Sequence, residues 1–482
     1  MSDSIETPRP PAEALARAEE ALARAPTDAR LLLARAQCLL VLGRLPEAGT
    51  AAAAVERHAP ADPVLWDALG TLFSRANDQR GALRAYDEAV RLAPREPQFL
   101  FNRAAVRRFL GALEDAEADY DRALALNPTD YEAYRNRADL RTQTAARNHV
   151  AELERALAAG RPDWHGEVQL RYALAKELED LGEHERSFAH LARGARLRRE
   201  HMRYDPVGDL ATVDWIIEAF PDAGPGPAAD ASEESPIFIV GLPRSGSTLL
   251  ERILDSHSAV TAAGELPCFA HAVVDAVRRD GGPAPRSRRE LIARSARLDF
   301  AALGRDYLAR ARAAGATGAR FTDKMPLNHL YCALIERALP RARIVHVRRA
   351  PMAACYAIYK SLFEDGYPYS YDLTELARYY VAYERLMRHW ASLFPGAIHE
   401  VRYERLVADQ VTETQRLLQF CGLPWEDACV EFHRNPAAST TASAAQVRRP
   451  LYRTALEQWR RYERQLAPVQ RILAEAGITD AG

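Results

Sequence analysis

The stretch PIFIVGLPRSGSTLLERIL at residues 236–254 runs from an apolar, β-branched segment through a Gly, Pro and Ser turn into an amphipathic helical pattern. This order makes a cradle for a phosphate group, because main-chain N–H groups at the start of a helix point at an anion. The P-loop pattern of nucleotide-binding proteins, GxxxxGK[ST], would fit Gly241–Thr248 if residue 247 were Lys. Residue 247 is instead Ser247, and the cation of the turn is Arg244.

The missing lysine decides which phosphate the turn can hold. In P-loop enzymes that lysine reaches the β- and γ-phosphates, so its absence argues against ATP and GTP. No apolar strand ending in a magnesium-holding Asp stands out downstream. We therefore expect a single 5′-phosphate, without a metal ion, at four residues of the turn: Ser245, Gly246, Ser247 and Thr248. A kinase-like P-loop enzyme that depends on magnesium is the alternative.

Short apolar runs alternate with helical patterns through the second half of the chain. The runs are IFIVG (237–241), ARFTDK (319–324), RIVHVRR (343–349) and IHEVRYE (398–404). Alternation of this kind predicts an α/β domain with a parallel sheet and helices on both faces. Ligands of such sheets bind beyond the carboxyl ends of the strands, so we expect the functional residues there.

The first half of the chain repeats every 34 residues. Prolines recur at this interval, four of them with an acidic residue two positions later: Pro26, Pro60, Pro94, Pro128 and Pro162, with Asp28, Asp62, Glu96 and Asp130. Small and aromatic residues recur at matching offsets: Ala48, Ala82 and Ala116, Tyr86 and Tyr120, and Ala89 and Ala123. Because proline favours turns and first helical positions, each one is expected to mark the boundary between stacked helical pairs.

The period and the residue types resemble the tetratricopeptide repeat, a helix-turn-helix unit. The resemblance implies an all-α solenoid whose concave groove binds a protein or peptide. The alternatives are a spacer or a dimerisation arm, which would make the protein a homodimer. A segment rich in Pro, Gly, Ala and Ser follows. We expect the repeat array over residues 10–205, a connecting helix and linker over 206–235, and the α/β domain over 236–482.

The composition limits the partners and the compartment. With 64 basic and 66 acidic side chains, the chain has no general attraction to nucleic acid or to an anionic membrane. It shows no signal pattern, and no apolar run approaches the roughly 18 to 20 residues that span a bilayer. Six scattered cysteines without metal-binding spacing are typical of a reducing compartment. We expect a soluble, cytoplasmic protein without a structural metal.

Four blocks of the second half resemble, in order and spacing, the sulfotransferase domain of tyrosylprotein sulfotransferases, above all a bacterial branch with tetratricopeptide repeats in front of it. They are GLPRSGSTLLERILDSHSAVTAAGEL (241–266), FTDKMPLNHLYCALIERALPRARIVHVRRAP (321–351), VRYERLV (401–407) and ASAAQVRRPLY (442–452). The resemblance implies a P-loop-like fold that uses PAPS, 3′-phosphoadenosine 5′-phosphosulfate. Such enzymes move the sulfuryl group of PAPS to a hydroxyl or phenol.

Sulfuryl transfer builds negative charge on the bridging oxygen, so cations and hydrogen-bond donors are needed beside the 5′-phosphate. Arg244 is the first candidate, since its guanidinium can bridge phosphate and sulfuryl oxygens. Lys324 is the second. Only Lys176, Lys324 and Lys360 are lysines among the 64 basic residues. Where Arg is used almost everywhere, a retained Lys can mark a place that needs a compact point charge.

The acceptor hydroxyl needs a base. Glu265 follows the loop and helix at the spacing where the family has its catalytic carboxylate, and a partly buried Glu can have a raised pKa. His329 and His346 compete for this role, since His is the more usual base. His346, however, lies within an apolar strand, where a core imidazole is expected.

The 3′-phosphate is expected after the run at 343–349, where the resemblance implies an Arg followed eight residues later by a Ser. Arg349 fits the Arg, with Arg348 as the alternative. The Ser position falls on Ala357, for which Lys360 or Ser361 are candidate substitutes. The sequence departs from the family at two more positions. Related proteins commonly have polar or charged residues where this chain has Ala350 and Met352.

The last two blocks complete the expected pocket. Tyr403 matches a strand-end Tyr near the nucleotide, although a core aromatic would look the same. The segment at 442–452 resembles a loop that folds over the cofactor. In it, Ser443 is expected to donate to the sulfuryl or bridging oxygen, and Arg449 to pair with a phosphate.

These observations predict a PAPS-dependent sulfotransferase that acts on a hydroxyl. By resemblance the acceptor is a tyrosine phenol in a protein or peptide that the repeats recruit. The alternative, favoured by the departures near the 3′-phosphate, is a catalytically impaired repeat scaffold that binds protein partners.

Overall fold

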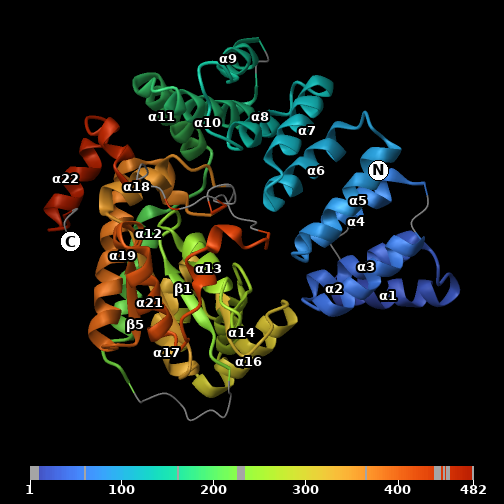
Figure 1. Ribbon diagram of the computed structural model, residues 1–482. Helices are drawn as coiled ribbons and strands as arrows, with labels where there is room; N and C mark the ends of the chain where they lie inside the picture. The colour runs from blue at the N-terminus through green and yellow to red at the C-terminus, as the bar shows by residue number, and fades with distance from the viewer. Residues whose placement is uncertain are drawn as a thin grey trace, which may run out of the picture. The chain divides into compact units, whose positions relative to one another are not determined.

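The computed structural model describes residues 10–58, 61–159, 162–224, 234–363, 366–438, 447–448, 451 and 456–479. The chain divides into two compact units, one built mainly from residues up to Arg141 and the other mainly from Thr142 onward. Figure 1 shows their helices and strands, many of them labelled. Each unit has a hydrophobic core of its own.

The first unit consists of α-helices that pack in pairs. They are α1 (Pro11–Arg24), α2 (Ala29–Val41), α3 (Leu45–His58), α4 (Pro63–Arg75), α5 (Gln79–Leu92), α6 (Pro97–Leu110), α7 (Leu113–Leu126) and α8 (Tyr131–Ala138). The first helices of four successive pairs, α2, α4, α6 and α8, begin at residues 29, 63, 97 and 131, again 34 residues apart. The predicted array of helical pairs is therefore confirmed.

The acidic residues of the 34-residue period lie at the N-caps of these helices. Asp28, Asp62 and Asp130 each accept a hydrogen bond from a main-chain N–H of the following first turn. Such a cap contributes about 1 kcal/mol to stability. Glu96 holds the same position before α6 without a side-chain bond. The recurring acid thus marks where each pair starts.

Small residues allow the two helices of a pair to approach closely. A Cβ placed on Gly70 of α4 would lie 2.6 Å from the ring of Tyr86 of α5. Tyr120 of α7 is fully buried, as are Ala82 and Ala116, which stand at equivalent positions of two repeats. Aromatic rings therefore fill the space that the small residues leave, as the sequence pattern predicts.

The second unit is built around a five-stranded parallel sheet with the strand order β2-β3-β1-β4-β5. The strands are β1 (Ile237–Gly241), β2 (Thr261–Ala262), β3 (Phe321–Asp323), β4 (Arg343–Arg348) and β5 (Ile398–Arg402). Four of them confirm the predicted runs. β2 has only two residues, too few to show the alternation from which a strand is predicted.

Helices cover both faces of this sheet (Figure 1). α13 (Ser247–Asp255) and α21 (Gln410–Phe420) pack on apolar residues of β1, β4 and β5, among them Ile239. On the opposite face, Phe238 packs edge-to-face against Phe269 of α14 (Cys268–Arg279), with 5.9 Å between the ring centroids. The predicted α/β architecture is confirmed.

The remaining helices of this unit surround the sheet or precede it in the chain. They are α9 (Val150–Ala159), α10 (Trp164–Asp180), α11 (His184–Glu200), α12 (Pro206–Ala219), α15 (Arg288–Ser295), α16 (Phe300–Ala313), α17 (Cys332–Ala338), α18 (Pro351–Tyr359), α19 (Leu373–Leu393), α20 (Tyr403–Ala408) and α22 (Ala467–Glu475). Short 3₁₀ turns connect several of them, including η1 (Pro326–Tyr331) and η2 (Pro368–Tyr371).

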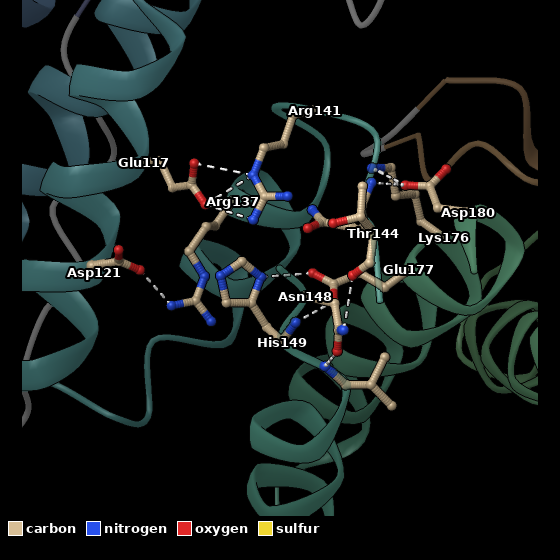
Figure 2. A network of polar contacts seen from close by, with 12 residues as sticks. Glu117, Asp121, Arg137, Arg141, Thr144, Asn148, His149, Lys176, Glu177 and Asp180 are labelled. Carbon is tan, nitrogen blue, oxygen red and sulfur yellow. Dashed lines mark hydrogen bonds and ion pairs between the residues drawn. The ribbon is translucent and has the colours of Figure 1, made fainter. Parts of the chain in front are cut away.

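The helical pair α10 and α11 belongs to the second unit. Figure 2 shows Glu177 of α10 accepting hydrogen bonds from the main-chain N–H of His149 at 2.6 Å and from its ring at 2.8 Å. In the same view, Lys176 pairs with Asp180 at 2.7 Å. The two bonds to Glu177 fix the segment before α9 onto α10.

Two further ion pairs connect α10 and α11 to helices that flank the sheet. Glu179 accepts from Lys360, the residue after α18, at 2.8 Å, and Arg199 makes two hydrogen bonds of 2.8 Å to Glu375 of α19. The compact units thus divide near residue 141, whereas the domain limits at 205 and 235 remain a prediction from repeat spacing and composition.

All six cysteines lie among the described residues, and each is a free thiol. Five of them are buried, as expected for small apolar side chains. Within the described ranges, none of the helices combines the length and the apolar character that crossing a bilayer requires.

Candidate functional site

The described residues of the predicted site lie at or just beyond the carboxyl ends of the five parallel strands. The turn from Gly241 to Thr248 follows β1, Glu265 follows β2, Lys324 follows β3, Arg349 follows β4, and Tyr403 follows β5. The parallel sheet therefore places along one edge residues that are far apart in the chain. Ser443 and Arg449 lie outside the described residues, so their assigned roles remain predictions.

The turn after β1 is held by its own contacts. A Cβ on Gly241 would lie 2.5 Å from the carbonyl oxygen of Val347 in β4, so only glycine fits this strand end. Arg244 has a φ of +63°, in the left-handed region. The hydroxyl of Ser245 donates to the carbonyl of Leu242 at 2.7 Å. Ser245 thus braces the turn with its side chain and can offer a ligand its main-chain N–H.

Helix α13 begins at Ser247, with Gly246 as its N-cap. Glycine has no side chain with which to cap the first turn, and the N–H groups of that turn have no acceptor within the helix. They also form the positive end of the helix dipole. Ser247 and Thr248 are both buried at this end. A helix N-terminus therefore lies where the sequence pattern predicts a phosphate cradle, and phosphate binding there stays a prediction.

Arg349 and Tyr403 close the turn from the side of β4 and β5. Nη1 of Arg349 donates to the carbonyl of Arg244 at 3.1 Å, and its guanidinium lies 5.0 Å from the centroid of the Tyr403 ring. A Cβ on Gly246 would lie 2.6 Å from Cδ2 of Tyr403. The ring therefore packs against the glycine of the turn.

Arg348, the alternative for the 3′-phosphate, contacts a different part of the unit. It makes two hydrogen bonds of 3.0 Å to the buried carboxylate of Glu384 in α19. Successive side chains of a strand point to opposite faces of a sheet, which separates Arg348 from Arg349. Arg349 contacts the turn, whereas Arg348 pairs with Glu384.

Lys324 and Glu265 form an ion pair. The side chain of Lys324 is 1% exposed, whereas that of Glu265 is 46% exposed. The main-chain N–H of Lys324 donates to the carbonyl of Gly264 at 2.8 Å, which holds the two segments together. Because a buried ammonium is costly without a paired carboxylate, this ion pair stabilises the buried side chain of Lys324. Solvent can reach the carboxylate of Glu265.

The two competing histidines are core imidazoles. Burial lowers the pKa of both His329 and His346 to about 4. Nδ1 of His329 lies 2.9 Å from the carbonyl oxygen of Pro326, and Nε2 of His346 is bonded to the hydroxyl of Tyr383. Both rings are enclosed and neutral at pH 7, whereas Glu265 is half-exposed. The role of Glu265 as the base stays a prediction.

The two candidate substitutes near the 3′-phosphate segment have other partners. Nζ of Lys360 pairs with Glu179 at 2.8 Å, and the hydroxyl of Ser361 donates to the carbonyl of Ala357 at 2.9 Å. Ala357 itself is buried in α18. The substitution of the expected Ser by Lys360 or Ser361 stays a prediction.

Two carboxylates of the site were not among the predicted residues. Glu251 of α13 is buried and accepts a hydrogen bond from the hydroxyl of Thr322 at 3.2 Å. Asp323 is fully buried, accepts a hydrogen bond from the hydroxyl of Tyr307 at 3.0 Å, and has its pKa raised to about 7 by burial. Glu251 stands one helical turn after Ser247, and this spacing is the signal that places it on the inner face of α13.

Residues 236–427 match the model of the sulfotransferase family, and residues 11–72 and 68–131 match models of the tetratricopeptide repeat. An uncharacterized protein of Aquifex aeolicus is 31% identical over 374 residues, which cover 76% of this chain and 49% of that protein. The chain therefore spans about half the length of this relative.

A putative protein-tyrosine sulfotransferase of Caenorhabditis briggsae is 27% identical over 243 residues, covering 47% of this chain and 81% of that protein. Among solved structures, the sulfotransferase domain from the curacin biosynthetic pathway aligns with a TM-score of 0.35 and 16% identity, over 51% of this chain and 98% of that one. Residues 236–427 thus form a domain of the sulfotransferase family, carried in one chain with tetratricopeptide repeats.

Proposed function

We propose that this chain transfers the sulfuryl group of PAPS to the phenol of a tyrosine in a protein or peptide. The observation that carries the proposal is the contact between buried Lys324 and half-exposed Glu265 at the strand ends that also hold the phosphate-type turn. The family match of residues 236–427 supports the reaction class. The choice of tyrosine is supported by the name of the Caenorhabditis relative.

The turn and the neighbouring strand ends would hold PAPS, which supplies the sulfuryl group when it is bound. The main-chain N–H groups of residues 245–248 would bind the 5′-phosphate, with Arg244 as the cation beside it. Arg349 would contact the 3′-phosphate. Lys324 would donate to the oxygen on which negative charge grows, and the proposal assigns no metal ion.

Glu265 would take the proton of the acceptor hydroxyl. Its side chain is 46% exposed, so an acceptor can reach it from solvent. The ion pair with Lys324 holds the carboxylate in position before the acceptor arrives. General-base catalysis of this kind contributes about 10² to 10⁴ in rate.

We assign the recruitment of the acceptor to the repeats, since stacked helical pairs present an extended surface on which such arrays bind proteins. The six free thiols support action in a reducing compartment, the cytoplasm. A homodimer formed through the repeats is the competing use of the same surface.

The test is transfer of label from ³⁵S-PAPS by the full chain to a peptide library that contains tyrosine, with matched peptides in which phenylalanine replaces tyrosine. We expect label in the tyrosine peptides, in the presence and absence of a chelator. Loss of transfer on chelation would favour the kinase-like alternative. A chain that binds 3′,5′-ADP but labels no acceptor would favour the impaired scaffold, for which Ala357 is the supporting observation.

A further inference from the structure

A cavity lies at the edge of the parallel sheet that is opposite to the predicted PAPS site. Its volume is about 480 Å³, which is in the range of cavities that hold small molecules. The residues that line it lie at or near the amino ends of the strands, and they include Ser235, Ala259, Arg320, Pro340, Arg341 and Arg343. Arg343 and Arg349 are six residues apart along β4, so the two edges are separated by about 20 Å.

Main-chain hydrogen bonds fix the segments that carry the three arginines of this cavity. The N–H of Arg343 donates to the carbonyl of Pro236 at 2.9 Å, and the carbonyl of Arg320 accepts from the N–H of the first β2 residue at 3.2 Å. The hydroxyl of Ser235 donates to the carbonyl of Arg341 at 2.6 Å. The main chain of all three arginines is thus held in place before any ligand binds, which lowers the entropic cost of binding.

The three guanidinium groups lack a paired counter-charge. Within the described part of the chain, none of them has an ion pair or a hydrogen bond. Glu234, beside the cavity in the chain, accepts instead from Nε of Arg312 at 2.8 Å. Burial raises the pKa of Glu336 and the charge of Arg343 opposes that rise, although no ion pair joins these two described residues.

The carboxyl end of α21 packs against two of the arginines. The guanidinium of Arg343 lies 5.8 Å from the centroid of the Phe420 ring, and Nη2 of Arg320 lies 3.8 Å from the Cβ position of Gly422. The end of a helix carries only about half of a negative charge. Because this partial charge cannot balance three guanidinium groups, the cavity keeps a net positive charge.

We propose that this arginine cavity, formed around Arg320, Arg341 and Arg343, binds the phosphate group of a small phosphate monoester at a site separate from that of PAPS. Guanidinium groups bind phosphate oxygens through pairs of parallel hydrogen bonds. A phosphate monoester carries nearly two negative charges at pH 8, since its second pKa is about 6, whereas a sulfate monoester carries only one. Three arginines without a paired counter-charge favour the doubly charged group.

The test uses the full-length wild-type protein and phenylglyoxal, a reagent that modifies arginine side chains. The rate of modification at each arginine is read from the masses of its peptides. Methyl phosphate and methyl sulfate are the probes, added at pH 8 and at constant ionic strength. They differ in charge and scarcely in size, so they distinguish a phosphate monoester from a sulfate monoester. Rates at single arginines also separate this cavity from the turn at residues 241–248.

We expect saturating methyl phosphate to slow the modification of Arg320, Arg341 and Arg343 at least about fivefold. Methyl sulfate should need at least about 10-fold higher concentration for the same protection, because it offers one charge fewer to the guanidinium groups. The exposed Arg434 should react at an unchanged rate. Unchanged rates at the three arginines would overturn the proposal, and equal protection by the two probes would overturn the assignment to a phosphate monoester.

A second arm removes two of the three charges and uses the third arginine as the reporter. In the double variant Arg320→Gln and Arg343→Gln, the concentration of methyl phosphate that half-protects Arg341 should rise at least about 10-fold. The matched control is Arg289→Gln with Arg434→Gln, which removes the same number of charges from exposed ion pairs. Equal half-protection of Arg341 in the two double variants would contradict the proposal.

The first arm uses only the wild-type protein, so it does not depend on how the variants fold. Neither arm needs PAPS, an acceptor or turnover. Failure of the arginine cavity to bind a phosphate monoester is thereby distinguished from failure of the proposed sulfuryl transfer.

Discussion

The ring of Tyr403 lies directly against Gly246, so that a Cβ on this glycine would come within 2.6 Å of Cδ2 of the ring. Arg349 in turn lies 5.0 Å from the centroid of the same ring and donates to the carbonyl of Arg244. The turn after β1 is thereby connected to the ends of β4 and β5. Its shape is set by residues that follow it by more than 100 positions.

This packing predicts a large effect of Gly246→Ala. The residue has a φ of +108°, which Ala adopts only with strain of about 1 to 3 kcal/mol, and the new methyl group would displace Tyr403. We expect the affinity for 3′,5′-ADP, measured by calorimetry, to fall at least about 10-fold. Gly396→Ala is the control, because Gly396 has a φ of +83° with nothing within 4 Å of its Cβ position. Equal affinities in the two variants would contradict the packing argument.

Lys324→Ala should lower turnover by about 10² to 10³, since it removes a donor from the developing negative charge. The control is Lys176→Ala, which deletes the same side chain from an ion pair with Asp180 in α10. Single-turnover transfer of ³⁵S-label measures both variants. Full activity of the Lys324→Ala protein would show that this lysine has no role in the chemistry.

The buried carboxyl of Asp323 makes the stability depend on pH. Its pKa is raised to about 7 in the folded protein by burial, above the roughly 3.9 of an unfolded chain. Between these two pKa values the folded protein keeps a proton on Asp323 that the unfolded chain has released. The contribution of this proton to the free energy of unfolding is fully present below the unfolded pKa of roughly 3.9 and is lost as the pH rises through 7.

Asp323→Asn still accepts a hydrogen bond from Tyr307 but does not titrate. The variant should therefore not lose stability as the pH rises through 7. Relative to the wild type, we expect the variant to gain on the order of 4 kcal/mol in unfolding free energy between pH 4 and pH 8. Denaturant unfolding across this range measures the difference, with the exposed Asp214→Asn as the control. If the unfolding free energies of Asp323→Asn and the wild type change with pH in parallel, Asp323 does not have the raised pKa.

The ion pair between Glu179 and Lys360 predicts that α10 stabilises the sheet domain. Glu179 is held charged against the cost of burial by Lys360, and it also accepts from the hydroxyl of Tyr356. Breaking a fully buried ion pair costs about 3 to 5 kcal/mol. The side chains of Lys360 and Glu179 are 28% and 10% exposed, so Glu179→Ala should cost part of that and lower the Tm of the second unit by a few degrees. Glu183→Ala, in an exposed pair with Arg186, should have little effect in the same thermal scan.

Much of the fold could be predicted because its signals are local. The 34-residue period reflects N-caps such as Asp28 and Asp62, and the runs that became β1 and β4 are apolar and β-branched. The positions of the site residues at strand ends followed from the parallel sheet alone. β2 escaped prediction because two residues carry no periodic signal.

The contacts that complete the site are long-range and have no local signal. The spacing of Glu251 from Ser247 places it on the inner face of α13, but its partner Thr322 lies 71 positions away in the chain, and no local pattern indicates that contact. Arg348 and Arg349 are neighbours in the chain, and their different partners depend on α19 and on the turn after β1. The anchoring of α10 by Lys360 likewise joins residues 181 positions apart.

The central claim is that the turn at residues 241–248 holds the 5′-phosphate of a 3′-phosphorylated adenosine nucleotide. Titration of 3′,5′-ADP into the full-length protein in a calorimeter tests it most directly. We expect a single site that needs no added metal ion, and at least about 10-fold weaker binding in Arg244→Ala. A folded protein that takes up no 3′,5′-ADP, or that binds it equally well without Arg244, would contradict the account.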